Sequence, residues 1–302
     1  MSLSQKAFKN GEEIIKEGDI GKSFYLLTEG KAGVYANYEK NNPFRIAVLE
    51  PGEYFGEMAI LEAYPRNATV VAVGNVNVIE IPADEMSTFF EENPEQVFEL
   101  MKHIGKRIQL MTDDYNESEA LLKEARGTTA NTQSESFFSK IKKHINMYQS
   151  NKNSVNEPNE EALRAELIEL FGTLSDKTEA FEKDTIVYSE GDTEDCMFVL
   201  QRGTVGMYTN CGEANEAKTS ELNAISFFGE VEMATGEPRS VTAVSETDDT
   251  RIEVIYPEDL AEMVQTNPAK VNLILRYLSY RLRRLNIDFL KNCKEITESY
   301  NK

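Results

Sequence analysis

The chain has 302 residues, of which 40% are hydrophobic and 28% charged, a balance typical of globular proteins and sufficient in length for two domains. Its 52 acidic residues against 32 basic ones give a formal charge of −20, which disfavours binding to nucleic acid. No apolar run approaches the roughly 18 residues that a membrane-spanning helix needs. The first residues, MSLSQKAFKNGEE, lack the basic start and apolar stretch of a secretory signal, so we expect a cytoplasmic protein.

A segment near the start of the chain returns in the second half. FKNGEEIIKEGDIGKSFYLLTEGKAGVY begins at Phe8, and FEKDTIVYSEGDTEDCMFVLQRGTVGMY begins at Phe181. Three pairs of landmarks are each 173 positions apart: Gly18 and Gly191, Glu57 and Glu230, and Arg66 and Arg239. A constant offset across so many turns predicts two copies of one domain.

Each copy first shows a β pattern and then a helical one. Short β-branched and aromatic runs, such as residues 24–27, 46–49 and 76–81, are separated by Gly, Asp, Asn or Pro, which is typical of an all-β barrel or jelly roll. From residue 84 to about 111, apolar residues recur at three- and four-residue steps, which predicts an amphipathic helical tail. The second copy ends in the same way between Leu260 and Leu290.

Between the copies, residues 127–135 and 149–159 are rich in polar residues and predict linkers. Residues 136–148 and 160–174 between and after them predict helices. We therefore expect a first domain with its tail over residues 1–126, a partly helical linker over 127–174, and a second domain with its tail over 175–302.

One short stretch in each copy carries the chemistry: FGEMAILEAYPRNATV begins at Phe55 and FFGEVEMATGEPRSVTAV at Phe227. The glycine opens a short helix whose free N–H groups can bind an anionic oxygen. The following glutamate can accept hydrogen bonds from ribose hydroxyls, and the arginine nine residues later can bind two phosphate oxygens. A glutamate for the sugar and an arginine for the phosphate, so close together, predict a site for a nucleotide whose phosphate lies against its ribose. We call these two stretches, residues 55–70 and 227–244, the first and second cassettes.

Both copies resemble the cyclic nucleotide-binding domain shared by the catabolite activator proteins and the regulatory subunits of cAMP-dependent kinase. The resemblance implies an eight-stranded β-roll, a double-stranded jelly roll with flanking helices. It assigns Glu57 and Glu230 to the ribose 2′-hydroxyl, and Arg66 and Arg239 to the cyclic phosphate. The rest of the predicted ligand-binding set consists of Gly56, Met58, Ala59, Asn67, Ala68, Gly229, Val231 and Ser240.

Two positions depart from the family pattern. Asn67 stands where the family has Ser or Thr close to the base, and a resemblance to the cGMP-dependent kinases favours cGMP over cAMP there. Glu232 stands where the family has a small residue beside the phosphate. We therefore expect the second domain to bind more weakly, with Glu232 either turned outward or paired with Arg239.

The pattern predicts a sensor that binds cAMP or cGMP and transmits occupancy through its helical tails to a partner protein, and it leaves open a homodimer through those tails. The alternative is a scaffold whose degenerate β-rolls serve protein contact alone. An activator of transcription is not expected, since the twelve residues after Leu290 are too few for a helix-turn-helix.

No enzyme, cofactor or metal is expected either. His103 and His144 are isolated, and the three cysteines lack metal-ligand or disulfide spacing, so the sequence predicts no catalytic metal cluster. The basic run RYLSYRLRRL with Lys291 and Lys294 is expected to be solvated or to pair with acidic groups, rather than to bind DNA or a membrane.

Overall fold

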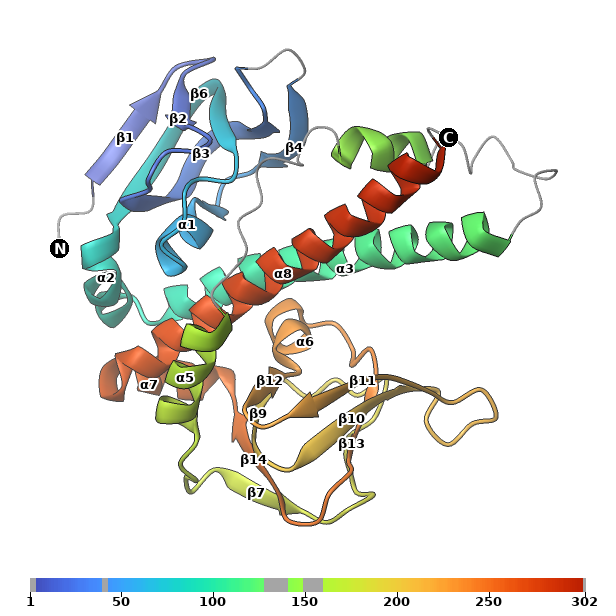
Figure 1. Ribbon diagram of the computed structural model, residues 1–302. Helices are drawn as coiled ribbons and strands as arrows, with labels where there is room; N and C mark the ends of the chain where they lie inside the picture. Colours follow the sequence, from blue (N-terminus) through green and yellow to red (C-terminus); the bar gives the residue numbers. More distant parts are fainter. Residues whose placement is uncertain (1–3, 40–42, 128–140, 149–159, 301–302) are drawn as a thin grey trace. The chain divides into compact units, whose positions relative to one another are not determined.

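The computed structural model of the chain describes residues 4–39, 43–127, 141–148 and 160–300 (Figure 1). The chain forms two compact units that interleave along the sequence. Unit 1 contains residues 1–89, 107–158 and 278–302, and unit 2 contains residues 90–106 and 159–277. The predicted linkers at 128–135 and 149–159, and residues 136–140 of the first predicted linker helix, lie outside the described residues.

The β-roll of unit 1 is built on two long strands. β3 (Ser23–Ala36) and β6 (Thr69–Pro82) pair antiparallel along most of their lengths. β1 (Ser4–Phe8) and β2 (Glu13–Ile15) pair with β6, while β4 (Phe44–Leu49) and β5 (Tyr54–Phe55) pair with β3. The sheet order β1-β6-β3-β4 places β4 at an edge.

The β-roll of unit 2 has eight strands in two four-stranded sheets. One sheet has the order β11-β10-β13-β8 and the other the order β12-β9-β14-β7. The first is formed by β8 (Ile186–Tyr188), β10 (Thr204–Thr209), β11 (Ala217–Asn223) and β13 (Thr242–Ser245). The second is formed by β7 (Thr178–Phe181), β9 (Met197–Arg202), β12 (Ser226–Phe228) and β14 (Thr250–Ile255).

The two β-rolls correspond position by position, as the 173-residue offset predicts. Shifted by 173 positions, β3 covers β9 and β10 together, and β6 covers β13 and β14 together. Equivalent side chains also form the two cores: Tyr25 and Phe198, for example, both lie within the buried apolar clusters. The prediction of two β-roll domains with helical tails is therefore confirmed.

The first tail is helical, as predicted, but it is divided and longer. After the short helix α1 (Glu57–Leu61), the first tail consists of the 3-10 helix η1 (Ala83–Glu85), α2 (Met86–Glu92) and α3 (Glu95–Gly127). The predicted tail from residue 84 to about 111 is helical, but it is interrupted at residues 93 and 94, and α3 continues beyond residue 111 to Gly127. Proline at the start of a helix is favourable because its missing N–H would have no partner there.

Residues 141–148 are helical, as predicted, and α5 (Glu160–Phe171) follows the second linker. Unit 2 then contains α6 (Glu230–Thr235) and α7 (Pro257–Thr266). The last helix, α8 (Pro268–Tyr300), has its residues up to Tyr277 in unit 2 and the remainder in unit 1. In unit 1 it lies along the second half of α3 (Figure 1), where Asn292 donates a hydrogen bond to Ser118 Oγ at 2.9 Å.

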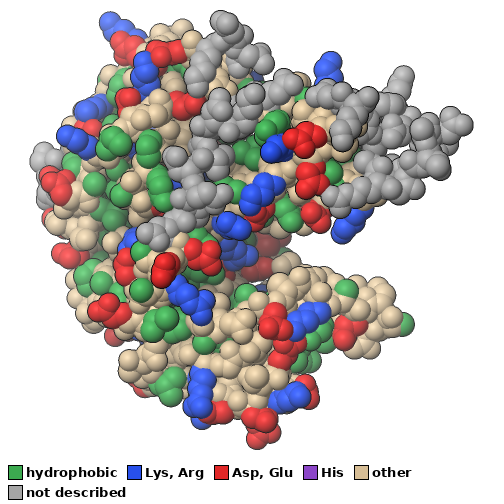
Figure 2. Space-filling view, in the orientation of Figure 1, with side chains coloured by type: hydrophobic (Ala, Val, Ile, Leu, Met, Phe, Trp, Pro, Cys, Tyr) green, Lys and Arg blue, Asp and Glu red, His purple; other side chains and the backbone are tan. Residues whose placement is uncertain are grey.

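Charged side chains of both signs are spread over the visible face in Figure 2. Ion pairs join many of the charged side chains of the described residues, such as Lys6 with Glu80 and Lys16 with Glu39. Basic residues of α8 are also paired with carboxylates. Arg276 binds Glu166 in unit 2, and Lys291 Nζ lies 3.1 Å from Asp288 Oδ1 in unit 1. The expectation that the basic run of this helix pairs with acidic groups is met at these positions.

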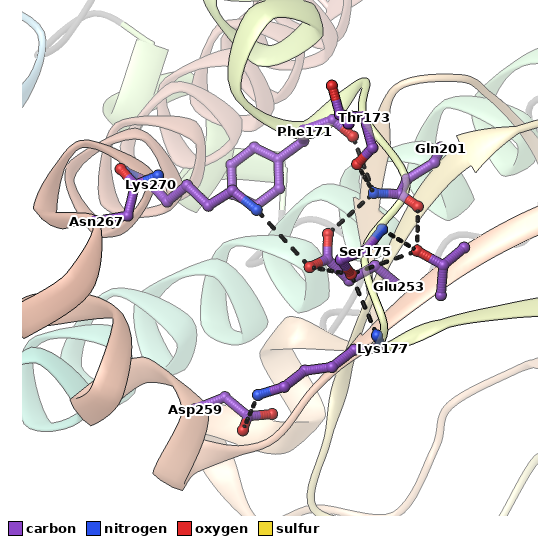
Figure 3. A network of polar contacts seen from close by, with 10 residues as sticks. Phe171, Thr173, Ser175, Lys177, Gln201, Glu253, Asp259, Asn267 and Lys270 are labelled. Atoms are coloured by element: carbon purple, nitrogen blue, oxygen red, sulfur yellow. Dashed lines mark hydrogen bonds and ion pairs between the residues drawn. The ribbon is translucent and has the colours of Figure 1, made fainter.

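A buried polar network fixes α5 and α8 to the β-roll of unit 2 (Figure 3). Gln201 Nε2 lies 3.0 Å from the Phe171 carbonyl oxygen and 3.0 Å from Glu253 Oε2. Glu253, only 2% exposed, also accepts a hydrogen bond from Ser175 and lies 3.7 Å from Lys270 Nζ at the start of α8. Buried polar groups are costly unless they are hydrogen-bonded, so Gln201 is central to this network.

We expect Gln201→Ala to lower the free energy of unfolding by about 1–3 kcal/mol, because it leaves the Phe171 carbonyl and the Glu253 carboxylate short of a donor. Urea unfolding of the full chain, with hydrogen exchange followed in β9 and β14, measures this loss. Arg202→Ala is the matched control, since Arg202 follows on the same strand and is 70% exposed. Equal losses for the two variants would show that the network does not stabilise unit 2.

Candidate functional site

The first cassette begins with a sharp turn at Gly56, between β5 and α1. Gly56 has a φ of 81°, in the left-handed region that glycine adopts without the steric cost of a Cβ. A Cβ built on Gly56 would also lie 2.7 Å from Arg66 Nη1. Glycine is therefore required here both by the backbone and by the arginine that packs against it.

Arg66 is only 7% exposed and its guanidinium is bound by the backbone. Nη1 donates to the carbonyl of Gly56 at 2.5 Å, and Nη2 donates to the carbonyl of Ser23. Burial lowers the pKa of the Arg66 guanidinium from its ordinary value, while Tyr25, Glu57 and Asp19 act in the opposite direction. The structure thus places a buried cation directly beside the glycine turn.

The second cassette repeats this arrangement around Arg239. Its Nη1 donates to the carbonyl of Gly229 at 2.7 Å, and its Nη2 to the carbonyl of Cys196 at 2.6 Å. Gly229 has a φ of 71°, and Cys196 lies 173 positions after Ser23. The Arg239 guanidinium also lies 4.7 Å from the ring centre of Tyr188, a cation–π contact.

The two glutamates of the cassettes are both buried, each 1% exposed. Arg107 of α3 donates from Nη1 to Glu57 Oε1 at 2.5 Å, and its Nη2 lies 3.3 Å from Met58 Sδ. Arg107 therefore ties the helical tail to the residue that is predicted to bind ribose. Its sequence signal is weak, because one arginine on a long helix has no spacing that singles it out.

Glu232 lies in the second cassette without pairing with its arginine. The Glu232 Oε1 atom accepts a hydrogen bond from Ser240 Oγ at 2.8 Å, while the Nη atoms of Arg239 donate to backbone carbonyls and to the sulfur of Cys196. Of the two alternatives considered for Glu232, pairing with Arg239 does not occur among the described residues. The carboxylate instead joins α6 to the residue that follows Arg239.

The remaining predicted residues lie in the same two stretches. Met58 and Ala59 are buried in α1, whereas Val231 in α6 is half-buried and Ser240 is exposed. Asn67 and Ala68 are half-buried directly after Arg66. The carbonyls of Ser23 and Cys196 were missed by sequence reasoning, since a backbone acceptor can belong to any residue type.

The family model of the cyclic nucleotide-binding domain matches residues 5–93 and 178–267, which span both β-rolls and both cassettes. The chain belongs to this family. The doubled match agrees with the internal repeat, and each match includes the glycine turn, the buried glutamate and the buried arginine of its cassette.

Curated relatives share shorter segments. The chain is 52% identical over 65 residues to a cGMP-dependent protein kinase of Plasmodium berghei, which covers 22% of this chain and 7% of that protein. It is 40% identical over 75 residues to a cAMP-dependent protein kinase regulatory subunit of Mucor circinelloides, covering 25% and 17% of the two chains. The chain thus matches less than a fifth of the length of either relative.

Among solved structures, the regulatory domain of Toxoplasma gondii PKA with cAMP matches at 18% identity over 89% of this chain and 85% of that one, with a TM-score of 0.28.

Other kinds of site are not apparent in the part of the chain that is described. No group of three or more His, Cys, Asp or Glu side chains is placed to hold a metal ion within residues 4–39, 43–127, 141–148 and 160–300. His144 is buried, with its ring 5.7 Å from that of Phe289. Within the same ranges, no helix has the length and apolar character needed to cross a membrane.

We expect Gly56→Ala to destabilise the protein by more than the roughly 1–2 kcal/mol that a left-handed backbone costs an L-residue, because its Cβ also displaces Arg66. Gly11→Ala is the control, since Gly11 has a similar φ of 84° and a Cβ added there would meet no atom within 4 Å. Urea denaturation of both variants measures the difference. If Gly11→Ala costs as much, the contact with Arg66 contributes nothing.

Proposed function

We propose that the chain is a regulatory protein that binds a cyclic mononucleotide, cAMP or cGMP, at its first cassette. The single observation that carries the proposal is the pairing of a buried glutamate with a buried arginine around one glycine turn, at the positions that the family motif assigns to ribose and phosphate. Glu57 accepts from the ribose hydroxyl, and Arg66 binds the cyclic phosphate.

The role is binding and regulation without a chemical step. Arg107 supports a route for the signal, because it joins Glu57 to α3 and so makes the helical tail sensitive to what the glutamate binds. A ligand shifts such an equilibrium only by binding the two states unequally. The partner is a protein kinase catalytic region, as the names of the relatives suggest, and a cytoplasmic location remains a prediction.

The second cassette is proposed to bind more weakly or to serve protein contact alone. Glu232 supports this proposal, because its carboxylate accepts a hydrogen bond from Ser240, the residue next to Arg239. Two like charges about 4 Å apart near a protein surface repel by roughly 4 kcal/mol, so a carboxylate there opposes an anionic ligand.

We expect Arg66→Lys to weaken binding at the first site about ten- to a hundredfold, because lysine keeps the charge but loses the planar pair of donors. Isothermal titration with cAMP and with cGMP measures the change. Lysine is preferred to alanine because Arg66 also satisfies two buried carbonyls, which alanine would leave without a donor.

Arg45→Lys is the matched control for this titration, since Arg45 is an exposed arginine on β4 of the same domain and should leave affinity unchanged. Affinity for both nucleotides that is the same in Arg66→Lys, Arg45→Lys and the wild type would exclude Arg66 as the phosphate ligand.

We expect Glu232→Ala to tighten binding at the second site about tenfold or more, because it removes a negative charge beside Arg239. Titration in an Arg66→Lys background isolates this site. Glu237→Ala removes an exposed carboxylate from the same cassette and serves as the control. Two equally strong sites in the wild-type protein would refute the proposed asymmetry.

A further inference from the structure

The last helix of the chain holds the first cassette through one buried arginine. In unit 1, Arg283 of α8 donates from Nε to Glu62 Oε2 at 2.9 Å, and Ser279, one turn earlier, donates to Glu62 Oε1 at 2.6 Å. The Arg283 guanidinium also lies 4.5 Å from the ring centre of Tyr64, and its Nη1 is 3.4 Å from Asn67 Oδ1. All these contacts are made within one compact unit.

This contact differs from the surface ion pairs of the chain because both partners are buried. The side chains of Arg283 and Glu62 are 2% and 7% exposed. Removing one partner of a buried pair leaves an uncompensated charge, which is strongly unfavourable. Arg283 Nη2 is buried without a hydrogen-bond partner among the described residues, so keeping the guanidinium in this position costs free energy.

The three residues that Arg283 engages stand on both sides of Arg66. Glu62 and Tyr64 precede it and Asn67 follows it, so the segment that carries the phosphate-binding arginine is fastened at both ends. The two Nη atoms of Arg66 meanwhile face the carbonyls of Gly56 and Ser23. Each Nη atom has a second N–H group, and the position of this segment determines whether these remaining donors can reach a phosphate.

Apolar packing holds the rest of α8 in unit 1 in place. Phe289, Leu290 and Cys293 form a buried cluster against Met111 and Tyr115 of α3. Ile296 packs with residues 121, 122 and 141 in a second cluster. Arg283 thus contacts the first cassette from a helix that packs against α3 in the segment that follows this arginine.

We propose that Arg283 is an autoinhibitory latch, and that docking of α8 on the first cassette competes with binding of the cyclic nucleotide there. This inference rests on the proposed function of the first cassette. By linkage, the ligand loosens α8 by the same factor by which docked α8 weakens the ligand.

A related contact in unit 2 fits this arrangement. Gly105 of α3 packs against α6, the helix of the second cassette: a Cβ on Gly105 would lie 2.9 Å from Ala234 Cβ. The tail that follows the first β-roll thus contacts the second cassette, just as the tail that follows the second β-roll contacts the first.

The latch is tested by isothermal titration of the full chain with cAMP and with cGMP, in an Arg239→Lys background that weakens the second site. We expect Arg283→Gln to bind about fivefold to a hundredfold more tightly than the protein with Arg283. Hydrogen exchange over residues 279–296, measured without ligand, should rise in the same variant. Arg284→Gln is the matched control, since Arg284 is the next residue of α8 and its side chain is 44% exposed.

A reversible lock gives a second test, in which the two states that are compared carry the same substitutions, so that the loss of the Glu62 carboxylate affects both equally. Glu62→Cys with Ser279→Cys, in a Cys211→Ser background, places two thiols where the side chains now touch. We expect the protein joined by a short thiol cross-linker with a cleavable disulfide to bind at least about tenfold more weakly than the same protein after reduction.

The outcomes separate the latch from the proposed function. Tighter binding by Arg283→Gln together with weaker binding by the locked protein supports the latch. If the wild type binds a cyclic nucleotide but affinity is unchanged in Arg283→Gln and in the locked protein, the latch is wrong and the function stands. If neither nucleotide binds the wild type, Arg283→Gln or the reduced cysteine variant, both are overturned.

Discussion

A guanidinium buried inside a β-roll needs hydrogen-bond acceptors, and in both cassettes backbone carbonyls supply them to the Nη atoms, although Arg239 Nε is buried without an acceptor among the described residues. Arg66 and Arg239 each donate to the carbonyl of the glycine that opens the cassette helix and to a carbonyl at a strand start, that of Ser23 in β3 and that of Cys196 just before β9. The left-handed glycine is needed because any side chain there would meet the arginine. The arginine thus contacts both the glycine turn that opens the short helix and the chain at the start of a strand, so a ligand that binds the arginine is in contact with a residue that joins these parts.

The helical tails extend this local constraint over longer distances. Arg107 joins Glu57 to α3, and Arg283 joins Glu62 to α8, so two helices contact the first cassette. Interfaces packed in this way tend to have discrete arrangements rather than continuous ones. Such an organisation suits a regulatory protein, because a change at a single arginine can be expressed in the position of a helix of 33 residues.

The sequence predicts the β-rolls well because their determinants are local. Turn glycines, alternating strands and the constant offset between Gly18 and Gly191 specify two copies of one domain. Glu57 and Arg66 can be predicted as site residues for the same reason, since they lie nine positions apart in one short motif. The true end of α3 and the role of Arg283 are not predictable in this way. Helix α3 continues past Met111 because Leu121 and Leu122 pack against Ile296, a residue 174 or more positions away along the chain.

The interleaving of the units has a consequence for how the chain folds as it leaves the ribosome. Domains tend to fold in the order in which they are synthesised. Unit 1 contains the first strand of the chain and also residues 278–302, so its helical part is incomplete until translation of this segment has finished. Unit 2 ends at Tyr277, so its residues are all synthesised before residues 278–302 of unit 1. Until α8 emerges, Met111 and Tyr115 of α3 lack their apolar partners, and the first β-roll is in an unlatched state during its own biosynthesis.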